Sequence, residues 1–364
     1  MCPLFRSRRH DPAEPGAAAS ARIGRREQHA LPAEIIADSP LQGRDAVLSD
    51  LDGVVYRGSD AVPDATPALE RARAAGLSVG FLTNNAARTP ETVAAQLCDL
   101  GLDAVPDDVV TSPQAAVMLL ADHVPAGSAV LVVGGEGLER ALTDAGYQVV
   151  RHQTPQTRAV VQGFARDVTW ADLAEAAFTI AAGAVWIGTN QDWTLPQERG
   201  IAPGNGTLIS AVHTATGTFP EIAGKPERHL FDLAVTRFRC ARPLVVGDRL
   251  DTDIEGARRA GLASALVLTG VDGATDLITA PPERRPDFLL ATLADLHRPY
   301  PLLELAPNGA VCGDAAVRID GRDVRIERGD PDDPDTIRAT AQAVWHSELP
   351  VAGLRLPDAY RPAR

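Results

Sequence analysis

The stretch VLSDLDGVVY, residues 47–56, decides the fold of this chain. A short apolar run, residues 46–49, leads into two aspartates, Asp50 and Asp52, and a glycine follows. In an extended strand, side chains two positions apart leave the backbone on the same side, so both carboxylates face the same way. Two carboxylates held this close repel each other and attract a cation, and hard oxygen ligands suit Mg²⁺. One carboxylate can then be a nucleophile and the other an acid or base.

Short β-rich segments and helix-patterned segments alternate on both sides of this stretch. We expect strands at 46–49, 78–82, 109–111, 244–246 and 265–268, and helices at 65–75, 90–100 and 252–260. This alternation predicts an α/β fold with a doubly wound, Rossmann-like parallel sheet that helices cover on both faces. Ligands of such sheets bind beyond the carboxyl ends of the strands, where Asp50 and Asp52 stand. Taken alone, Asp-Gly between two apolar runs would instead indicate a β-hairpin.

Length and charge narrow the class of protein. The chain has 364 residues, of which 45% are hydrophobic, so two or three domains are expected. A formal net charge of −13 disfavours a nucleic-acid partner, although a local lysine or a metal can still attract a phosphate. Four scattered cysteines without a CxxC pair favour a reducing cytoplasm. We expect no membrane association, because no apolar stretch approaches roughly 20 residues.

Composition and pattern divide the chain into five segments. Residues 1–38 mix Ala, Pro, Gly and charges and are expected to be a disordered tail. The main domain is expected to comprise 39–126 and 220–300. Residues 127–219 carry their own strand and helix signals and are expected to form an inserted α/β domain. Residues 301–364 predict a small α+β module, with turns at Asn308-Gly309 and Asp320-Gly321 before a helix at 335–346.

Three further motifs offer polar side chains where apolar runs end. Thr83, Asn84 and Asn85 follow a strand and precede a helix, so they can offer donors to a phosphate, or they form an ordinary polar turn. Lys225, in Gly-Lys-Pro, is either a solvated surface lysine or a cation that neutralises a phosphate. Asp248 and Asp253 follow the strand at 244–246. Asp248 can complete a metal site with Asp50, whereas Asp253 can orient a metal-bound water or simply favour the helix dipole.

In this order and spacing, the four motifs resemble those of the haloacid dehalogenase-type (HAD) phosphohydrolases. The segments DLDGVVYRG, TNN, GTNQD (188–192), GKP and GDRLDTDI are similar to the class IIA branch, which contains the nitrophenyl-phosphatase-like, phosphoglycolate and UMP phosphatases. The resemblance covers about 45–295. It implies that 127–219 is a cap domain over the site.

The resemblance also implies a mechanism. Asp50 would attack phosphorus and become an aspartyl-phosphate, and Asp52 would protonate the leaving alcohol and later deprotonate a water. Thr83, Asn84 and Asn85 would hold the phosphate, Lys225 would screen its charge, and Asn190 and Asp192 of the cap would contact substrate. Mg²⁺ would be bound by Asp50, the Asp52 carbonyl and Asp248, with Asp253 in support. The family's dehalogenases lack the second aspartate, so dehalogenation is not expected.

The expected substrate is a small organic phosphate monoester. Glycerol 3-phosphate is preferred, because the extra C-terminal segment resembles actinobacterial glycerol-3-phosphate phosphatases that carry an acetyltransferase-like tail. Phosphoglycolate, a nucleoside monophosphate and pyridoxal phosphate stay open as substrates. A phosphomutase and a non-catalytic phosphometabolite sensor stay open as functions. We expect residues 301–364 to be an acetyltransferase-like remnant that docks and stabilises, and we expect a homodimer.

Overall fold

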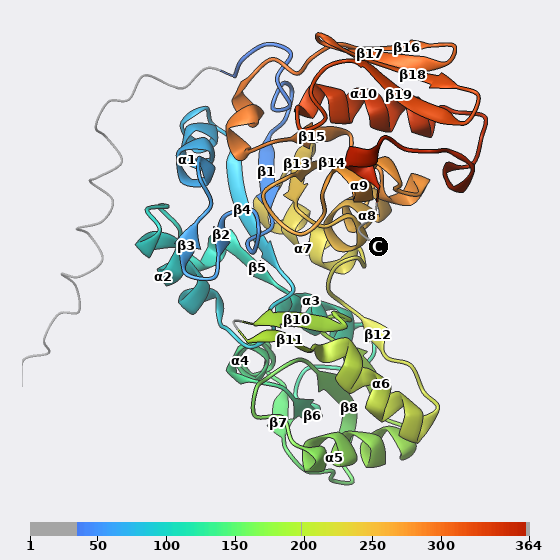
Figure 1. Ribbon diagram of the computed structural model, residues 1–364. Coiled ribbons are helices and arrows are strands. Elements are labelled where there is room, and N and C mark those ends of the chain that lie inside the picture. Colours follow the sequence, from blue (N-terminus) through green and yellow to red (C-terminus); the bar gives the residue numbers. More distant parts are fainter. Residues whose placement is uncertain (1–34, 198, 362–364) are drawn as a thin grey trace, which may run out of the picture.

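The computed structural model describes residues 35–197 and 199–361 (Figure 1). Its main sheet has six parallel strands in the order β15-β14-β13-β1-β4-β5. From one edge to the other they are β15 (Phe288–Leu290), β14 (Ala263–Val267), β13 (Pro243–Gly247), β1 (Ala46–Ser49), β4 (Ser78–Thr83) and β5 (Val109–Thr111). Because β1 lies between β4 and β13 and runs parallel to both, Asp-Gly at 52–53 does not close a hairpin with it.

Helices cover both faces of this sheet, which confirms the predicted doubly wound α/β class. Val47 packs on one face, with α1 (Ala65–Ala74) and α2 (Pro90–Asp99). Its neighbour Leu48 packs on the other, with α3 (Ser112–Ala121), α7 (His229–Phe238) and α8 (Glu255–Arg259). Alternation along β1 therefore buries the strand on both sides, as a continuous apolar run requires.

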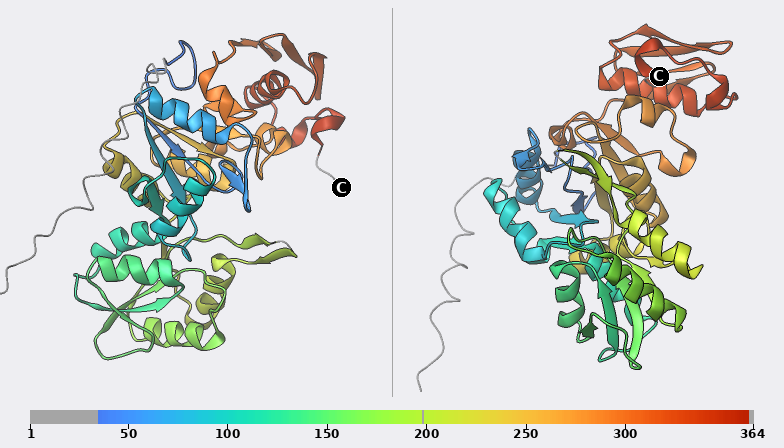
Figure 2. Two further views of the ribbon diagram at one scale, coloured as in Figure 1. Left: turned by 90° about the vertical axis from the view of Figure 1, so that its left-hand side faces the viewer. Right: turned by 60° about the horizontal axis from the view of Figure 1, so that its bottom comes forward.

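A second parallel sheet of five strands lies at the carboxyl edge of the first (Figures 1 and 2). Its order is β12 (Glu221–Ile222), β9 (Val185–Gly188), β8 (Thr157–Gln162), β6 (Ala129–Val133) and β7 (Gln148–Val150). Helices α5 (Trp170–Ala181) and α6 (Asn205–Thr216) pack on one face. Helix α4 (Glu136–Asp144) packs on the other, against α3 of the main domain.

Three elements of this second unit were not predicted from the sequence. The antiparallel hairpin of β10 (Thr194–Gln197) and β11 (Gly200–Pro203) was not predicted, nor was α6. The segment Pro203-Gly204-Asn205-Gly206 has the composition of a turn, but Gly204 is the N-cap of α6 and Asn205 its first residue. Glycine and asparagine favour turns and helix starts alike, so composition did not separate the two.

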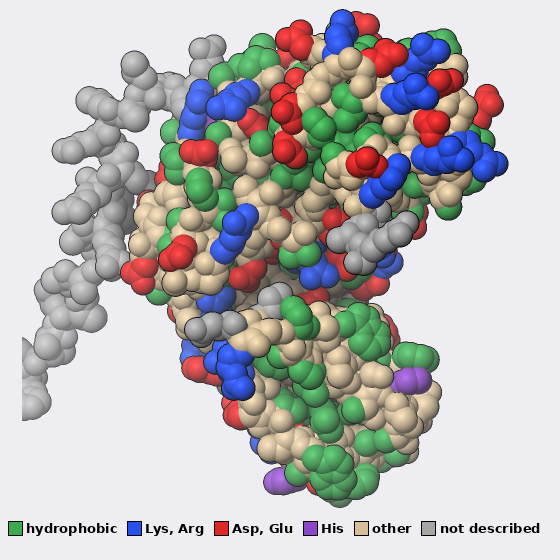
Figure 3. Space-filling view, viewed as in Figure 1, with side chains coloured by type: hydrophobic (Ala, Val, Ile, Leu, Met, Phe, Trp, Pro, Cys, Tyr) green, Lys and Arg blue, Asp and Glu red, His purple; other side chains and the backbone are tan. Residues whose placement is uncertain are grey.

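The C-terminal residues form an antiparallel sheet with one helix packed on it. The strands are β16 (Leu303–Ala306), β17 (Gly309–Cys312), β18 (Ala315–Asp320) and β19 (Asp323–Arg328), and the helix is α10 (Pro334–Trp345). Charged side chains of both signs cover the outside of this module (Figure 3). Inside, Val317 and Val324 share one apolar cluster with Leu250 and Leu289 of the main domain. The module therefore has no separate core.

Arg338 joins the module to the edge of the main sheet. It is 8% exposed, its Nε donates to the carbonyl of Leu289 at 3.2 Å, and its guanidinium lies 4.7 Å from the ring centre of Tyr300. Asp335, one turn earlier on α10, is its ion-pair partner. A buried arginine fixed in this way holds α10 against β15.

We expect Arg338→Met to lower the free energy of unfolding by about 2 kcal/mol, because the Leu289 carbonyl loses its donor inside the protein. Urea denaturation followed by circular dichroism measures the change. Arg325→Met is the matched control, because Arg325 is 63% exposed and its ion pairs lie at 3.7 and 4.0 Å. Equal stability losses in the two variants would contradict the anchoring role.

The start of the described chain lies against the main domain. Ile35 packs on its core, and the Tyr300 amide donates to the carbonyl of Asp38 at 2.9 Å. The tail expected at 1–38 otherwise falls on residues 1–34, outside the described residues. Two short strands, β2 (Tyr56–Arg57) and β3 (Asp60–Ala61), and the helix α9 (Ala274–Ile278) complete the elements that the site uses. Within the described part of the chain, no helix is both long and apolar enough to cross a membrane.

Candidate active site

A cleft of about 820 Å³ lies where the carboxyl edge of the main sheet meets the second unit. All the site residues that the sequence predicted line it, except Asp253, which is buried. They come from the ends of β1, β4 and β13, from the connection before α7, and from the segment after β9. The topology thus brings together motifs that are up to about 200 residues apart, as expected for the carboxyl ends of parallel strands.

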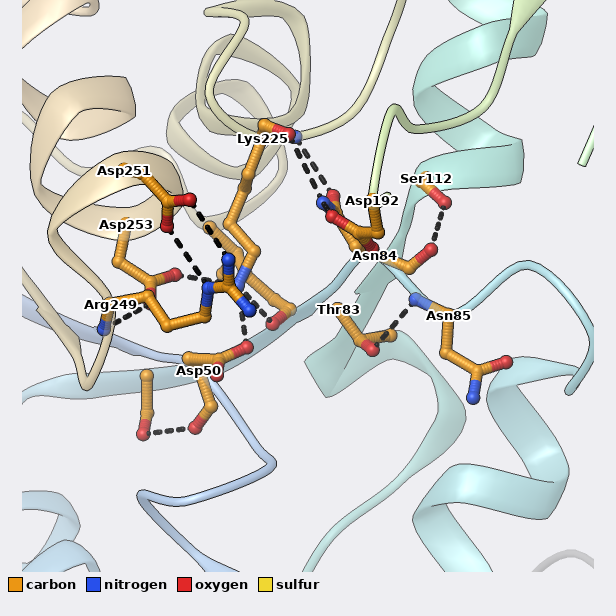
Figure 4. A network of polar contacts seen from close by, with 12 residues as sticks. Asp50, Thr83, Asn84, Asn85, Ser112, Asp192, Lys225, Arg249, Asp251 and Asp253 are labelled. Atoms are coloured by element: carbon orange, nitrogen blue, oxygen red, sulfur yellow. Dashed lines mark hydrogen bonds and ion pairs between the residues drawn. The ribbon is translucent and has the colours of Figure 1, made fainter. Parts of the chain in front are cut away.

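Lys225 is the centre of the charged network (Figure 4). It is the only lysine in the chain, and it is 4% exposed. Its Nζ lies 2.5 Å from Asp50 Oδ1 and 2.6 Å from Asp253 Oδ1. Burial alone would lower the pKa of Lys225, but the charges of Asp253 and Asp50 raise it above its ordinary value. Lys225 is therefore a fixed cation and not the solvated surface lysine of the alternative interpretation.

Burial raises the pKa of Asp50, and Lys225 opposes that rise. The backbone amide of Asp50 donates to the Val246 carbonyl at 2.8 Å. This bond extends the β1–β13 ladder by one residue and fixes the direction of the Asp50 side chain. Lys225 favours the charged form of this carboxylate, while burial keeps the group poorly hydrated. Such a group can act as a nucleophile.

Asp248 and Asp253 bring two more carboxylates to the same place. One carboxylate oxygen from each of Asp50, Asp248 and Asp253 lies within 4.8 Å of the others. Burial, together with the charge of Asp50, raises the pKa of Asp248 to about 8, and burial raises that of Asp253 to about 6 although Lys225 opposes it. These carboxylates are too crowded to be stable as anions without a cation.

The residues fit a hard divalent cation. Asp248 Oδ1 is buried and has no hydrogen-bond partner among the described residues. Asp253 is already engaged, since Oδ1 faces Lys225 and Oδ2 accepts the Arg249 amide at 3.2 Å. All the donors are oxygens, as Mg²⁺ requires. Asp50 and Asp248 are thus the carboxylates with a free direction toward an ion, and Asp253 supports them.

Asp253 owes its position to a turn that the sequence did not predict. In place of the start of one regular helix at 252–260, residues Leu250–Ile254 form a π-type turn, η3, in which the Ile254 amide bonds the Arg249 carbonyl at 3.2 Å. A Cβ on Gly247 would lie 2.2 Å from the Cβ of Asp253, so the close approach requires glycine there. Asp251, two residues earlier, instead pairs with Arg249 at 2.9 Å, with its side chain 43% exposed (Figure 4).

Asp52 lies at the mouth of the cleft and remains open to solvent. Loss of hydration next to the surrounding protein raises the pKa of Asp52, and the positive charges of Arg88 and Lys225 partly offset this rise. Arg88 is held by the hydroxyl of Tyr56, to which its Nη2 donates at 2.9 Å. A carboxyl group with a raised pKa beside the cleft is suited to giving and taking a proton.

The three polar residues after β4 play different structural parts. Thr83 Oγ1 accepts the Asn85 amide at 3.1 Å, and Asn85 Oδ1 in turn accepts the Ala87 amide at 2.9 Å. Asn84 Oδ1 accepts the Lys225 amide at 2.8 Å, while its Nδ2 donates to the Lys225 carbonyl at 3.1 Å. The side chain of Asn84 is therefore occupied in holding the lysine segment.

The two cap residues predicted to contact substrate continue this network. Asn190 is 3% exposed, and its Nδ2 donates to the Asn84 carbonyl at 2.7 Å while its Oδ1 accepts the Asp192 amide at 3.2 Å. Asp192 Oδ1 accepts from Asn84 Nδ2 at 3.2 Å. Burial raises the pKa of Asp192, although the bond from Asn84 lowers it. In this structure both side chains connect the second unit to the main domain.

Several cleft residues were missed by the sequence analysis. They include the basic side chains of Arg57, Arg88, Arg166 and Arg249, the hairpin residues Thr194 and Leu195, and the loop residues Gly270 and Val271. The loop had a signal, because Thr269-Gly270 follows β14, another strand that ends at the same edge. The arginines had none, since their pattern is that of an ordinary solvated surface.

Two family models match the chain. Residues 47–148 match the haloacid dehalogenase-like hydrolases, and residues 222–296 match a HAD-hydrolase-like model. The first match contains the Asp50 and Thr83 segments, and the second contains Lys225, Asp248 and Asp253. The first match also extends through β6 and α4 of the second unit, whereas most of the rest of that unit lies between the two matches.

Relatives and solved structures agree with the family models. The chain is 45% identical over 310 residues to the D-glycerol 3-phosphate phosphatase of Mycobacterium tuberculosis, over 84% of this chain and 87% of that protein. It is 36% identical to the acid sugar phosphatase of Staphylococcus aureus, over 64% and 89%. It resembles a crystal structure of glycerol phosphate phosphatase from M. tuberculosis in complex with magnesium, with a TM-score of 0.79, 44% identity and coverage of 88% and 94%. The chain belongs to the haloacid dehalogenase-like hydrolase family, among its phosphatases.

Proposed function

We propose that this protein is a Mg²⁺-dependent phosphatase that hydrolyses a small organic phosphate monoester, with glycerol 3-phosphate as its substrate. The single observation that supports it most is the arrangement of Lys225 between Asp50 and Asp253, with a free oxygen of Asp248 beside them. In this proposal Asp50 is the nucleophile, Lys225 is a fixed positive charge and Asp248 is part of a cation site, and their closeness in the cleft supports it. A phosphate group carries the charge that such a site is built to receive.

The proposed reaction has two steps. Asp50 attacks phosphorus, the bond from phosphorus to the ester oxygen breaks, and Asp52 gives its proton to the leaving alcohol. Asp52 then takes a proton from water as that water attacks phosphorus, which breaks the bond to Asp50 and releases inorganic phosphate. Throughout, Lys225 holds Asp50 in place and offsets negative charge near the phosphate, and Thr83 offers its hydroxyl to a phosphate oxygen.

Asp50 and Asp248 would hold Mg²⁺, together with the Asp52 carbonyl. The ion supplies positive charge that stabilises the transferring phosphoryl group. The Mg²⁺ in the similar M. tuberculosis structure supports this choice of metal.

We further propose that residues 127–219 act as a cap that closes over the cleft and limits substrate size. The hairpin of β10 and β11 supplies Thr194 and Leu195 to the cleft wall, and Asn190 and Asp192 join the cap to the main domain. Glycerol 3-phosphate is proposed because of the 45% identity to a D-glycerol 3-phosphate phosphatase, which extends over 84% of this chain. A cytoplasmic location and a homodimer stay predictions from the sequence.

The test is a phosphate-release screen. We expect inorganic phosphate to be released from glycerol 3-phosphate with a higher kcat/KM than from phosphoglycolate, UMP, pyridoxal phosphate or a sugar phosphate. Chelation should abolish release, and added Mg²⁺ should restore it, because the carboxylate cluster cannot hold a phosphate without a cation. Restoration by Zn²⁺ but not by Mg²⁺ would overturn the metal assignment.

The same screen separates the other functions. Tight binding of phosphate esters without any release would indicate a sensor. Conversion of one phosphate ester into an isomer, without free phosphate, would indicate a phosphomutase. A higher kcat/KM for phosphate release from another ester would support the same phosphatase chemistry and change only the assigned substrate.

A further inference from the structure

The loop Thr269–Asp272, which we call the clamp, encloses the side chain of Asp248. The Val271 amide donates to Asp248 Oδ2 at 2.7 Å, whereas Oδ1 is buried and has no partner among the described residues. One oxygen is thus held by the backbone and the other is left for an ion. A carboxylate bonded in this way cannot turn freely, so its ligand atom keeps one direction.

Two positions next to the Asp248 carboxylate require glycine, because a larger side chain there would clash with it. A Cβ on Gly270 would lie 1.9 Å from Asp248 Oδ2, and a Cβ on Gly53 would lie 2.3 Å from the same atom. Gly53 belongs to the turn that carries Asp52, and it has a φ of +81°, which favours glycine. The clamp and the Asp52 turn therefore close on Asp248 from two sides.

Hydrogen bonds join the clamp to both segments that carry site carboxylates. Thr269 Oγ1 donates to the Gly53 carbonyl at 2.7 Å, and Arg57 Nε donates to the Thr269 carbonyl at 2.7 Å. At the other end, the Asp272 amide donates to the Asp248 carbonyl at 3.1 Å. Asp272 Oδ2 accepts the Leu250 amide at 2.6 Å, which fixes the start of the η3 turn that contains Asp253.

The C-terminal module lies behind this arrangement. Helix α9 starts two residues after the clamp, and it packs against α10. Leu250 and Ile254 of η3, together with Leu277 of α9, belong to the apolar cluster that the module completes. The module thus packs against the η3 turn and helix α9, which adjoin the segments that carry Asp248 and Asp253.

We propose that the clamp sets the direction of Asp248 for Mg²⁺, and that Asp272 is its principal positioning residue; this rests on the proposed function. Asp272 is not among the residues that line the cleft. It acts by holding the Asp248 backbone through its amide and the η3 turn through its carboxylate. Outer groups that orient metal ligands typically contribute 10–100-fold to affinity.

The test compares Mg²⁺ binding by the full chain and by Asp272→Ala. Calorimetry gives the dissociation constant directly, without turnover. NMR spectroscopy gives a second measurement. Because Lys225 is the only lysine, protein made with ¹³C-lysine shows the signals of one lysine side chain, which lies at the site and can be followed as Mg²⁺ is added. We expect Asp272→Ala to weaken Mg²⁺ binding about 10-fold by both readouts. Asp272→Asn, whose amide oxygen can still accept the Leu250 bond, should recover most of the loss.

The matched control is Asp276→Ala. It removes the same charge four residues later and also removes an acceptor, since Asp276 Oδ2 accepts the Gly273 amide at 3.0 Å, but its side chain is exposed and has no described bond to the clamp or η3. We expect its Mg²⁺ affinity to stay within about twofold of the parent. Equal weakening in both alanine variants, or none in Asp272→Ala, would overturn the positioning role. Absence of Mg²⁺ binding by the parent chain would instead overturn the proposed function.

Discussion

Asp50→Asn should reduce kcat by at least about 10³-fold, the scale seen when a covalent nucleophile is removed. The asparagine oxygen can still accept from Lys225, and it occupies nearly the same volume, so the fold should be kept. What is lost is the negative oxygen that attacks phosphorus. Single-turnover phosphate release and circular dichroism on the same samples measure the two effects separately.

Asp60→Asn is the matched control for Asp50→Asn. Asp60 lies ten residues later on β3 and is exposed, and its side chain accepts a surface bond from Ser59 at 3.2 Å. The control should retain wild-type activity. Retention of a tenth of the activity by Asp50→Asn, which corresponds to about 1.4 kcal/mol of barrier, would rule out Asp50 as the nucleophile.

Lys225→Met should be the most damaging single change to both stability and activity. Methionine fills the space, but it leaves Asp50 and Asp253 facing each other inside the protein with no cation between them. Removing one partner of a buried ion pair typically costs about 3–5 kcal/mol. Part of this cost is avoided when a carboxyl group takes up a proton, so we expect a loss of about 3 kcal/mol, measured by urea denaturation.

The same change should lower kcat/KM by at least about 10²-fold, since the positive charge that favours the carboxylate form of the nucleophile and offsets phosphate charge is lost. The pKa of Asp50 is already raised by burial, and losing Lys225 raises it further. The carboxylate form therefore becomes more populated as pH rises, so the activity of the variant relative to the parent should increase with pH. A constant ratio across the pH range would show that Lys225 does not keep Asp50 ionised.

Arg228→Met is the control for Lys225→Met. It removes one positive charge three residues later, where the side chain is 60% exposed and pairs with Asp232 at 2.7 Å. Surface pairs of this kind contribute about 0–1 kcal/mol. Its stability and its pH profile should both remain close to those of the parent.

Five of the six strands of the main sheet, and the motifs at their ends, were predictable from the sequence, whereas β15 was not predicted. Buried parallel strands are continuous apolar runs of β-branched and aliphatic residues, and these stand out locally at 46–49 and 244–246. Each run is followed at once by the polar residues that line the cleft. Because the carboxyl ends of parallel strands share one edge, the meeting of Asp50, Thr83 and Asp248 was predictable before any contact was known.

Tertiary structure alone decided what each polar side chain does at that edge. Asn84 and Asn190 looked like free donors in sequence, but their amides are used to join Lys225 and Asp192 to the main domain. Asp251 and Asp253 are two residues apart in one motif, yet one pairs with the half-buried Arg249 and the other is buried beside Lys225. The sequence left Lys225 open as a surface lysine or a site cation, and its burial between Asp50 and Asp253 decides for the second. The physical reason is that the burial of a side chain depends on segments that are distant in the chain. Its charge state and its hydrogen-bond partners depend on the same segments, and the local sequence does not indicate which of them will lie nearby.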